Sequence, residues 1–145
     1  MKLSVSVTGA EAVREQFVRI AQAPRIALDA TAVKIEEYID TQVAPHNKTH
    51  ALERSLGKRR IPGGWEISHD SRIAPYARFV HDGTKPHAIF PRNKKALRWA
   101  AGGAFHFAGK VNHPGTKPDK WMERAANLAP RIFAAELAAR INKEG

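Results

Sequence analysis

The sequence predicts an α+β protein in which a small antiparallel sheet is packed by a long N-terminal helical segment and a C-terminal helix. Three observations lead to this class. Two long stretches, one near each end, place apolar residues at helical spacing. Glycine-containing turns at 62–64 and 102–103 separate short segments that can pair as hairpins. The first residues alternate between apolar and polar side chains, as a half-buried strand does. We expect one domain over residues 1–145.

The N-terminal part is predicted to be a strand followed by two helices. Residues 3–7 alternate and give the strand. From Ala10 the period becomes helical, and a first helix should end at the break signalled by Pro24. A second helix should occupy about 25–43 and stop at Ala44-Pro45, because a residue before proline avoids helical angles. The apolar positions of the first helix are Val13, Phe17 and Ile20.

The pairing of the first hairpin is predicted from side-chain parity, because a one-residue shift exchanges the two faces of a strand. A three-residue loop at 62–64 pairs Ile61 with Trp65 on one face. The same register places Arg60 across from Glu66 on the other face, as an opposite-charge pair. A two-residue Gly-Gly turn would lose both pairs, so we expect the three-residue loop.

The same argument is applied to the second hairpin. A two-residue Gly-Gly turn is common in hairpins, but it would mix apolar and polar side chains on each face. A three-residue loop at 101–103 instead aligns Leu97 and Trp99 with Phe107 and Phe105. This register predicts that the aromatic side chains belong to the core.

The C-terminal half is predicted to contain a short helix and a long one. Residues 74–83 can form one or two helical turns, and the segment from Asp119 to about residue 142 is strongly helical. Asp119 is a candidate N-cap. Pro130 should kink or split the long helix, because proline removes a backbone donor.

Composition limits the possible function classes. The chain has 145 residues, no cysteine, and a formal net charge of +10; the missing cysteines exclude disulfides, thiolate metal sites and a cysteine nucleophile. No apolar run approaches the ~18 residues of a membrane span, and the start lacks a signal-peptide core. We therefore expect a soluble protein made in a cytoplasm. The positive charge favours polyanions or acidic partners. The basic residues are dense at two spots, Lys58, Arg59 and Arg60, and Arg92, Lys94 and Lys95.

Seven histidines suggest a metal site, but their spacing does not supply one. His46 and His50 are four residues apart in an expected loop, without the glutamate of an HExxH motif. His106 and His113 have no carboxylate at ligand spacing, and metal sites need several convergent ligands. We expect no metal and no cofactor.

Catalytic motifs are also not indicated. Ser68, His69 and Asp70 are the right residue types for a triad, but neighbours on one strand point to opposite faces. There is no nucleophile elbow in the sequence. We expect the protein not to be an enzyme.

Two nearly identical stretches, HDGTKP at 81–86 and HPGTKP at 113–118, are predicted to be turns. A phosphate loop needs successive backbone N–H groups, and the proline after each lysine removes one. Glycine permits positive φ, threonine can bond back to the local backbone, and proline holds the preceding lysine extended. The two copies should form the same turn at both ends of the second hairpin.

Four motifs follow one another over most of the chain: a strand-Gly-helix start, an Ala-Pro followed by Thr and Leu, a Tyr-Ala followed by an aromatic and Gly-Thr, and a His-Pro-Gly-Thr before an aromatic and the last helix. They are carried by Pro45, Thr49, Leu52, Tyr76, Ala77, Gly83, Thr84, His113, Pro114, Gly115, Thr116 and Trp121. In this order they resemble a family of small virion proteins of tailed phages, the head–tail joining, tail-completion or neck proteins. Two departures from the family pattern are His50 in place of a glycine after Thr49 and His81 in place of an acid.

The resemblance implies a non-enzymatic component of the neck or upper tail of a phage or prophage. Such a protein would be found in the virion, and in the host cytoplasm during assembly. It would form a homo-oligomeric ring, a hexamer or dodecamer, and contact neighbouring neck, connector or tail-tube proteins. Rings need heterologous contacts between two different patches. Contact with packaged DNA is an additional expectation, and membrane contact is not expected.

Two interpretations of the second hairpin follow. In the first, residues 86–112 form a protruding assembly arm, so that deletion of 92–110 should leave a folded protein that no longer assembles. In the second, the chain is a basic nucleic-acid-binding module, because stacking platforms combine aromatics with basic residues. In the predicted register, Trp99, Phe105 and Phe107 lie on the apolar face of the hairpin, which favours a core position over stacking.

Overall fold

A computed structural model describes residues 10–46 and 49–143, so the strand predicted at 3–7 lies outside the described residues. The described chain has a long N-terminal helix, a C-terminal helix and small antiparallel sheets of two strands each, which confirms the α+β class. It divides into two compact units, Met1–Ala74 with Trp121–Gly145, and Pro75–Lys120. The expected arm at 86–112 lies wholly within the second unit.

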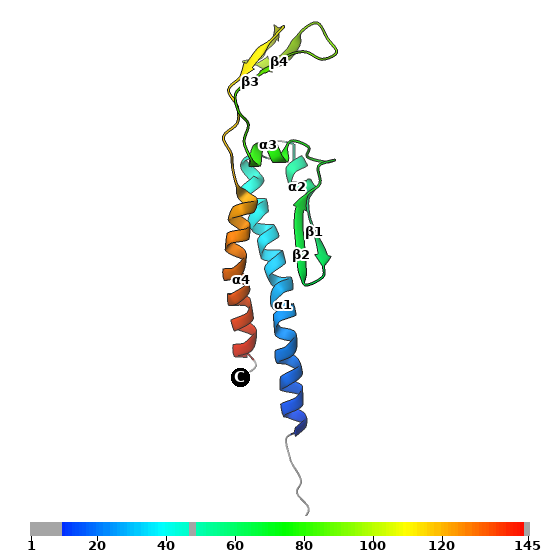
Figure 1. Cartoon of the computed structure of the whole chain (residues 1–145), viewed down its shortest axis with the longest axis vertical. Coiled ribbons are helices and arrows are strands. Elements are labelled where there is room, and N and C mark those ends of the chain that lie inside the picture. Colours follow the sequence, from blue (N-terminus) through cyan, green and yellow to red (C-terminus); the bar gives the residue numbers. More distant parts are fainter. Residues whose placement is uncertain (1–9, 47–48, 144–145) are drawn as a thin grey trace, which may run out of the picture. The chain divides into compact units, whose positions relative to one another are not determined.

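Helix α1 (Ala10–Val43) is one continuous helix of 34 residues (Figure 1). The prediction that Pro24 would end a first helix is wrong. An interior proline costs about 3 kcal/mol because it removes one hydrogen bond and crowds the preceding turn. Here the helix formers on both sides of Pro24 share one apolar stripe. The carbonyl that loses its hydrogen bond is that of Ile20, four residues earlier, and it lies in a stretch of exposed side chains where water is available. The stop at Ala44-Pro45 is confirmed, since a 3-10 turn, η1 (Ala44–His46), follows.

Helix α4 (Trp121–Lys143) packs antiparallel along α1 (Figure 1). Arg124 at its start donates to Gln42 near the end of α1 (3.0 Å), whereas Glu136 reaches back to Lys34. Pro130 lies inside α4 and does not split it. The helix begins at Trp121, two residues after the predicted N-cap.

Strands β1 (Leu56–Ile61) and β2 (Gly64–His69) form a hairpin against α1. The predicted three-residue loop is wrong: the turn has two residues, with Gly63 at a φ of +79°. Proline followed by a glycine at positive φ is the preferred chemistry of a type II turn. The observed register pairs Arg59 with Glu66, Arg60 with Trp65 and Ile61 with Gly64.

The core of the first unit is small. Short helix α2 (Ala51–Ser55) contributes Leu52, and the largest fully buried side chains are Trp121, Ile39, Leu52 and Val43. Several other buried positions are alanines, including Ala27 and Ala125, where α1 and α4 approach each other. Close packing of two helices through small residues stabilises the pair without burying much apolar area.

The second unit contains one short helix and two nested strand pairs. Helix α3 (Ala77–His81) lies within the short helical segment that the sequence predicts. Strand β3 (His87–Ile89) pairs with β6 (Val111–His113), and β4 (Leu97–Ala101) pairs with β5 (Ala104–Ala108). Within the described residues the strands form three separate pairs rather than the single sheet that we expected.

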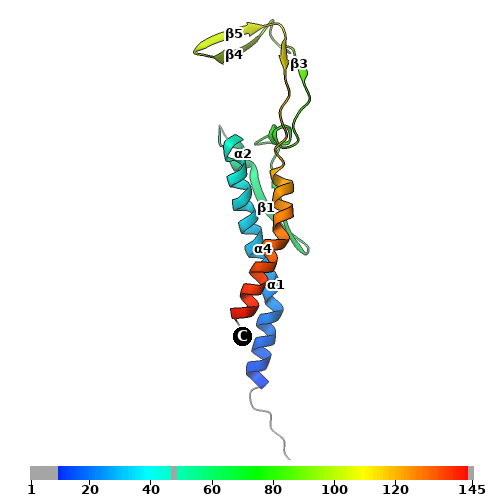
Figure 2. The same ribbon diagram turned by 90° about the vertical axis from the view of Figure 1, so that its left-hand side faces the viewer.

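The β4–β5 hairpin, seen in Figure 2, has a different register from the predicted one. Its turn is the two-residue Gly102-Gly103, with φ values of +59° and +79°, as a type I′ turn requires. The observed pairs are Leu97 with Ala108, Arg98 with Phe107, Trp99 with His106, Ala100 with Phe105, and Ala101 with Ala104. The parity prediction fails because it assumes a buried face.

The aromatic side chains of this hairpin are exposed, which contradicts the expected core position. Phe105 and Phe107 are 60% and 66% exposed, and Trp99 is 41% exposed. Without a core to cover either face, the hydrophobic pattern does not select the register. Turn chemistry selects it instead.

Candidate functional site

The two GTKP stretches lie opposite each other and form a local pairing, here called the GTKP clasp (residues 83–86 and 115–118). Thr84 N–H donates to the Thr116 carbonyl (2.9 Å), and Thr116 N–H donates to the Thr84 carbonyl (3.1 Å). Thr116 N–H also lies 3.0 Å from Thr84 Oγ1. The clasp joins the entry and exit of the β3–β6 pair, so the repeated sequence serves one structure. Sequence reasoning predicted the two turns and missed their mutual pairing.

Both glycines of the clasp are required by geometry. Gly83 and Gly115 have φ values of +74° and +89°, a region that side chains rarely tolerate. A Cβ at Gly83 would lie 2.7 Å from the Thr116 carbonyl oxygen, and one at Gly115 would contact the Thr84 carbonyl oxygen even more closely. Each glycine therefore allows the opposite strand to approach.

Two histidine groups lie near the clasp. His113 stacks on His87 across β6 and β3, with ring centroids 5.1 Å apart, and its Nδ1 accepts from Gly115 N–H (3.0 Å). His81 lies 2.7 Å from Asp82, which also binds Lys120 at 3.0 Å. These hydrogen bonds, from His81 and from Lys120, lower the pKa of Asp82.

No group of three or more metal-ligating side chains occurs within residues 10–46 and 49–143. The backbone N–H groups of Thr84 and Thr116 are already used in the pairing of the clasp itself. The arrangement is that of a structural turn pair.

A serine and a histidine do meet in the first unit, although they are not the neighbouring pair that the sequence suggests. Ser55 Oγ lies 2.9 Å from His69 Nδ1, and Trp121 Nε1 donates to His69 Nε2 (3.1 Å). Because an indole nitrogen only donates, Nε2 is the acceptor and Nδ1 carries the proton. The Ser55 hydroxyl donates to the Leu52 carbonyl (2.6 Å). His69 therefore donates a hydrogen bond to the Ser55 oxygen, whereas a general base would accept the serine proton.

The motif residues of the first unit contribute to packing and to the direction of the chain. Leu52 and Trp121 are fully buried, and the Trp121 ring lies 5.9 Å from that of His46. Pro45 lies in η1 directly after α1, and Thr49 is exposed before α2. In the second unit, Tyr76 precedes α3, Ala77 is its first residue and is buried, and Pro114 precedes Gly115 of the clasp.

The first basic spot is neutralised within its own unit. Lys58 pairs with Glu36 of α1, Arg60 pairs with Asp29 of α1, and Arg59 binds Glu66 of β2 at 3.0 Å. The Arg60 guanidinium also lies 4.7 Å from the Trp65 ring centroid. Lys58 and Arg60 thus hold the hairpin to the helix, and Arg59 joins the two strands of the hairpin, which makes all three less available as contacts for a polyanion.

The second basic spot has a different environment. Arg92, Lys94 and Lys95 are exposed in the loop between β3 and β4. They belong to residues 83–118, a stretch of 36 residues without Asp or Glu, here called the acid-free segment. Its cations are Lys85, Arg92, Lys94, Lys95, Arg98, Lys110 and Lys117. No carboxylate within this segment can neutralise them.

The first unit carries an uncovered apolar stripe on α1. Val13, Phe17 and Ile20 continue, at steps of three and four residues, the stripe that contacts α4 further along the helix. Every described side chain from 11 to 22 is exposed, and Phe17 is 67% exposed. Figure 1 shows α1 extending beyond the end of α4.

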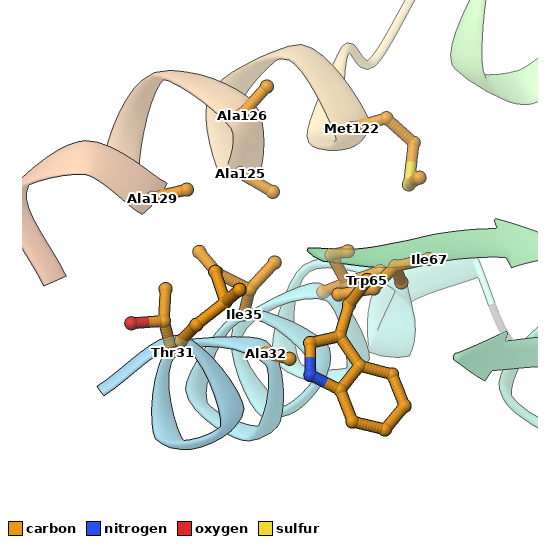
Figure 3. Close-up of a pocket in the computed structure, with 11 residues that line it drawn as sticks. Thr31, Ala32, Ile35, Trp65, Ile67, Met122, Ala125, Ala126 and Ala129 are labelled. Atoms are coloured by element: carbon orange, nitrogen blue, oxygen red, sulfur yellow. The ribbon is translucent and has the colours of Figure 1, made fainter. Parts of the chain in front are cut away.

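An apolar cleft of about 270 Å³ lies between α1, β2 and α4 of the same unit. Figure 3 shows Ile35, Trp65, Met122 and the alanines of α4 around this space. Ala126 lies at its border and is exposed. The stripe and the cleft are two different apolar surfaces on one unit.

No protein-family model, curated protein or solved structure matches this chain. Among the described residues, no helix has both the length and the hydropathy needed to span a bilayer.

Proposed function

We propose that this protein is a structural, non-enzymatic component of the neck or upper tail of a tailed phage or prophage, where it forms a ring as a tail-completion, terminator or head–tail joining protein. The order of the sequence motifs supports this role. The observation that carries it is the apolar stripe at Val13, Phe17 and Ile20, which the rest of the unit leaves exposed. Exposed apolar patches of this kind mark protein interaction sites.

The stripe and the cleft together suit a ring contact. A cyclic ring needs heterologous contacts, in which one patch meets a different patch on the neighbour. The stripe centred on Phe17 is convex and the cleft beside Trp65 is concave, and both have apolar surfaces. In the proposed ring, the stripe of each copy occupies the cleft of the next.

The contact is tested by two single substitutions and a matched control. Phe17→Asp places a charge in the stripe, Ala126→Arg obstructs the border of the cleft, and Gln22→Asp places the same charge on the opposite, exposed face of α1. Sedimentation velocity should show an oligomer for the wild type and for Gln22→Asp, and monomers for each of the other two variants.

Mixing the two defective variants tests the geometry. Phe17→Asp retains an intact cleft and Ala126→Arg retains an intact stripe, so an equimolar mixture should form dimers and no larger ring. An unchanged oligomer for both single variants, or a mixture that remains monomeric, would contradict the heterologous contact.

The position in the virion needs a separate experiment. Gold-labelled antibodies against the chain should bind purified particles at the head–tail junction when they are viewed by electron microscopy. Labelling confined to the capsid surface or the tail tip, or no labelling of particles from which the protein is recovered after disruption, would contradict the proposed location.

The assembly-arm hypothesis for residues 86–112 needs its own test. Deletion of 92–110 removes β4, β5 and the basic loop but keeps the residues of the β3–β6 pair and of the GTKP clasp. We propose that the shortened protein folds and fails to join heads to tails. Normal joining by this deletion would refute the arm hypothesis and leave the stripe and the cleft untouched.

A further inference from the structure

The charge of the protein is concentrated in the second unit. Residues 75–120 contain nine Lys and Arg against two Asp, a net charge of +7 out of the +10 of the whole chain. Both aspartates lie outside the acid-free segment, and Asp82 is held by His81 and Lys120. A field of one sign over so few residues attracts polyanions.

Aromatic rings are exposed within the same segment. Phe105 and Phe107 lie on one face of the β4–β5 hairpin together with Arg98, whose guanidinium is 3.9 Å from the Phe105 ring centroid. Trp99 and His106 stack on the other face, with ring centroids 5.6 Å apart. Each face therefore presents planar groups next to cations, to which a base can add by stacking.

We propose that the acid-free segment is a binding surface for single-stranded nucleic acid. The cations of the loop, Arg92, Lys94 and Lys95, contact phosphates, and the rings of Phe105 and Phe107 stack on bases. Charge complementarity identifies a polyanion, and the exposed rings select a single strand because bases in a duplex are already stacked on each other. This inference does not rest on the proposed ring.

The composition of the hairpin disfavours a lipid surface. Apart from the aromatic residues and Leu97, the apolar residues of β4 and β5 are alanines, which offer little area for insertion between acyl chains. The rings also lie on both faces, whereas a membrane-bound element collects its apolar side chains on one face. Planar groups on both faces suit a strand that winds around the hairpin.

The probe is a fluorescently labelled oligothymidine of about 20 nucleotides, a length that covers at least one typical single-strand site. Fluorescence anisotropy at several salt concentrations should show affinity that falls steeply with salt. Binding to a duplex of equal length should be at least tenfold weaker. Equal affinity for the duplex would overturn the single-strand assignment, and tighter binding to phosphatidylserine vesicles than to the oligonucleotide would overturn the whole proposal.

The electrostatic contribution has a matched control in the chain itself. Replacing Arg92, Lys94 and Lys95 by Gln removes three charges from the loop, and replacing Lys58, Arg59 and Arg60 by Gln removes three charges from the first unit. Three lost phosphate contacts should reduce the salt slope by about 2, at roughly 0.7 per contact for single strands, and weaken binding tenfold or more at low salt. The first-unit variant should stay within about threefold of the wild type; equal losses in both would show that only total charge matters and would reject a local site.

The stacking contribution is tested by changing shape and not hydrophobicity. Phe105→Leu with Phe107→Leu keeps apolar side chains but removes both rings, and should weaken oligothymidine binding tenfold or more. Phe105→Tyr with Phe107→Tyr keeps the rings and should bind as the wild type does. Since both side chains are more than half exposed, the fold should persist, and protected Thr84 and Thr116 amides verify this in each variant. Undiminished binding by the leucine variant would overturn the stacking site.

Discussion

Substitution of Gly83 by alanine should open the GTKP clasp. Gly83 has a φ of +74°, and a left-handed backbone costs an L-residue roughly 1–2 kcal/mol. The new Cβ would also lie 2.7 Å from the Thr116 carbonyl oxygen and 2.9 Å from Pro118 N, which are backbone atoms that can yield only if the strands separate. Forcing an atom into such a space typically costs a further 1–3 kcal/mol, at about the level seen for overpacked sites. The total is about 2–5 kcal/mol.

Gly103 provides a matched control for this substitution. Its φ is +79°, close to that of Gly83, but a Cβ at Gly103 would have no atom within 4 Å. Gly103→Ala therefore measures the conformational cost alone. The difference between the two variants isolates the steric part, roughly 5- to 150-fold in an equilibrium constant.

Amide hydrogen exchange measured by NMR reports the clasp directly, because Thr84 and Thr116 each donate to the other's carbonyl. Gly83→Ala should accelerate exchange at both amides, while Gly103→Ala should leave them near the wild-type rate, since its strain lies in the β4–β5 turn. If the Thr84 and Thr116 amides exchange no faster in Gly83→Ala than in Gly103→Ala, the close approach does not hold the clasp together and the reasoning fails.

Three further predictions concern the first unit. Burial raises the pKa of Asp40, and the negative charges of Glu53 and Glu36 raise it further, so the ionised Asp40 side chain destabilises the folded state. Asp40→Asn should therefore raise the melting temperature at neutral pH, and this gain should vanish below about pH 3.8, where the side chain is protonated in both states. A lower melting temperature at neutral pH would contradict this prediction. Hydrogen bonds from Lys34 and Arg140 lower the pKa of Glu136 in the folded state. The stability that this carboxylate contributes to the fold is therefore present above its ordinary pKa of 4.5 and is lost as the pH falls through the lower folded pKa. Glu136→Gln should therefore reduce thermal stability at pH 7 and not at strongly acid pH; equal loss at both would refute the ion pairing. Trp121→Phe removes the donor to His69 and should cost about 1–3 kcal/mol in urea unfolding, and an unchanged midpoint would show that this bond contributes nothing.

The sequence predicts the elements better than their pairing. The two long helices, the short helix at 77–81 and both hairpins follow from local patterns. Neither the break expected at Pro24 nor the split that was one of two alternatives at Pro130 occurs, because the cost of one interior proline is offset by continuous helix formers on either side and by packing of α1 against α4. A local rule fails here because the deciding contacts are between segments far apart in the chain.

The register errors have two different physical causes. In the first hairpin, parity would pair Arg60 with Glu66, but Asp29 of α1 binds both the Arg60 guanidinium and Trp65 Nε1. This partner lies 31 residues away from Arg60 and has no local signature. In the second hairpin no core exists on either face, so the assumption of one buried face has no physical basis. The two-glycine turn, which is plain in the sequence, is the better guide.

The two basic spots differ in how far their environment can be predicted from sequence. Residues 58–60 and 92–95 look alike as sequence, yet the first meets Glu36, Asp29 and Glu66 and the second lies in a segment without any carboxylate. The acid-free segment can be recognised by counting residues along the chain, and this count alone distinguishes the second spot from the first. Two of the ion pairs of the first spot depend on the packing of β1 on α1 and the third on the pairing of β1 with β2, and no count reveals these contacts. The proposed contact with nucleic acid is therefore expected at the second spot, since a phosphate at the first would compete with three existing ion pairs.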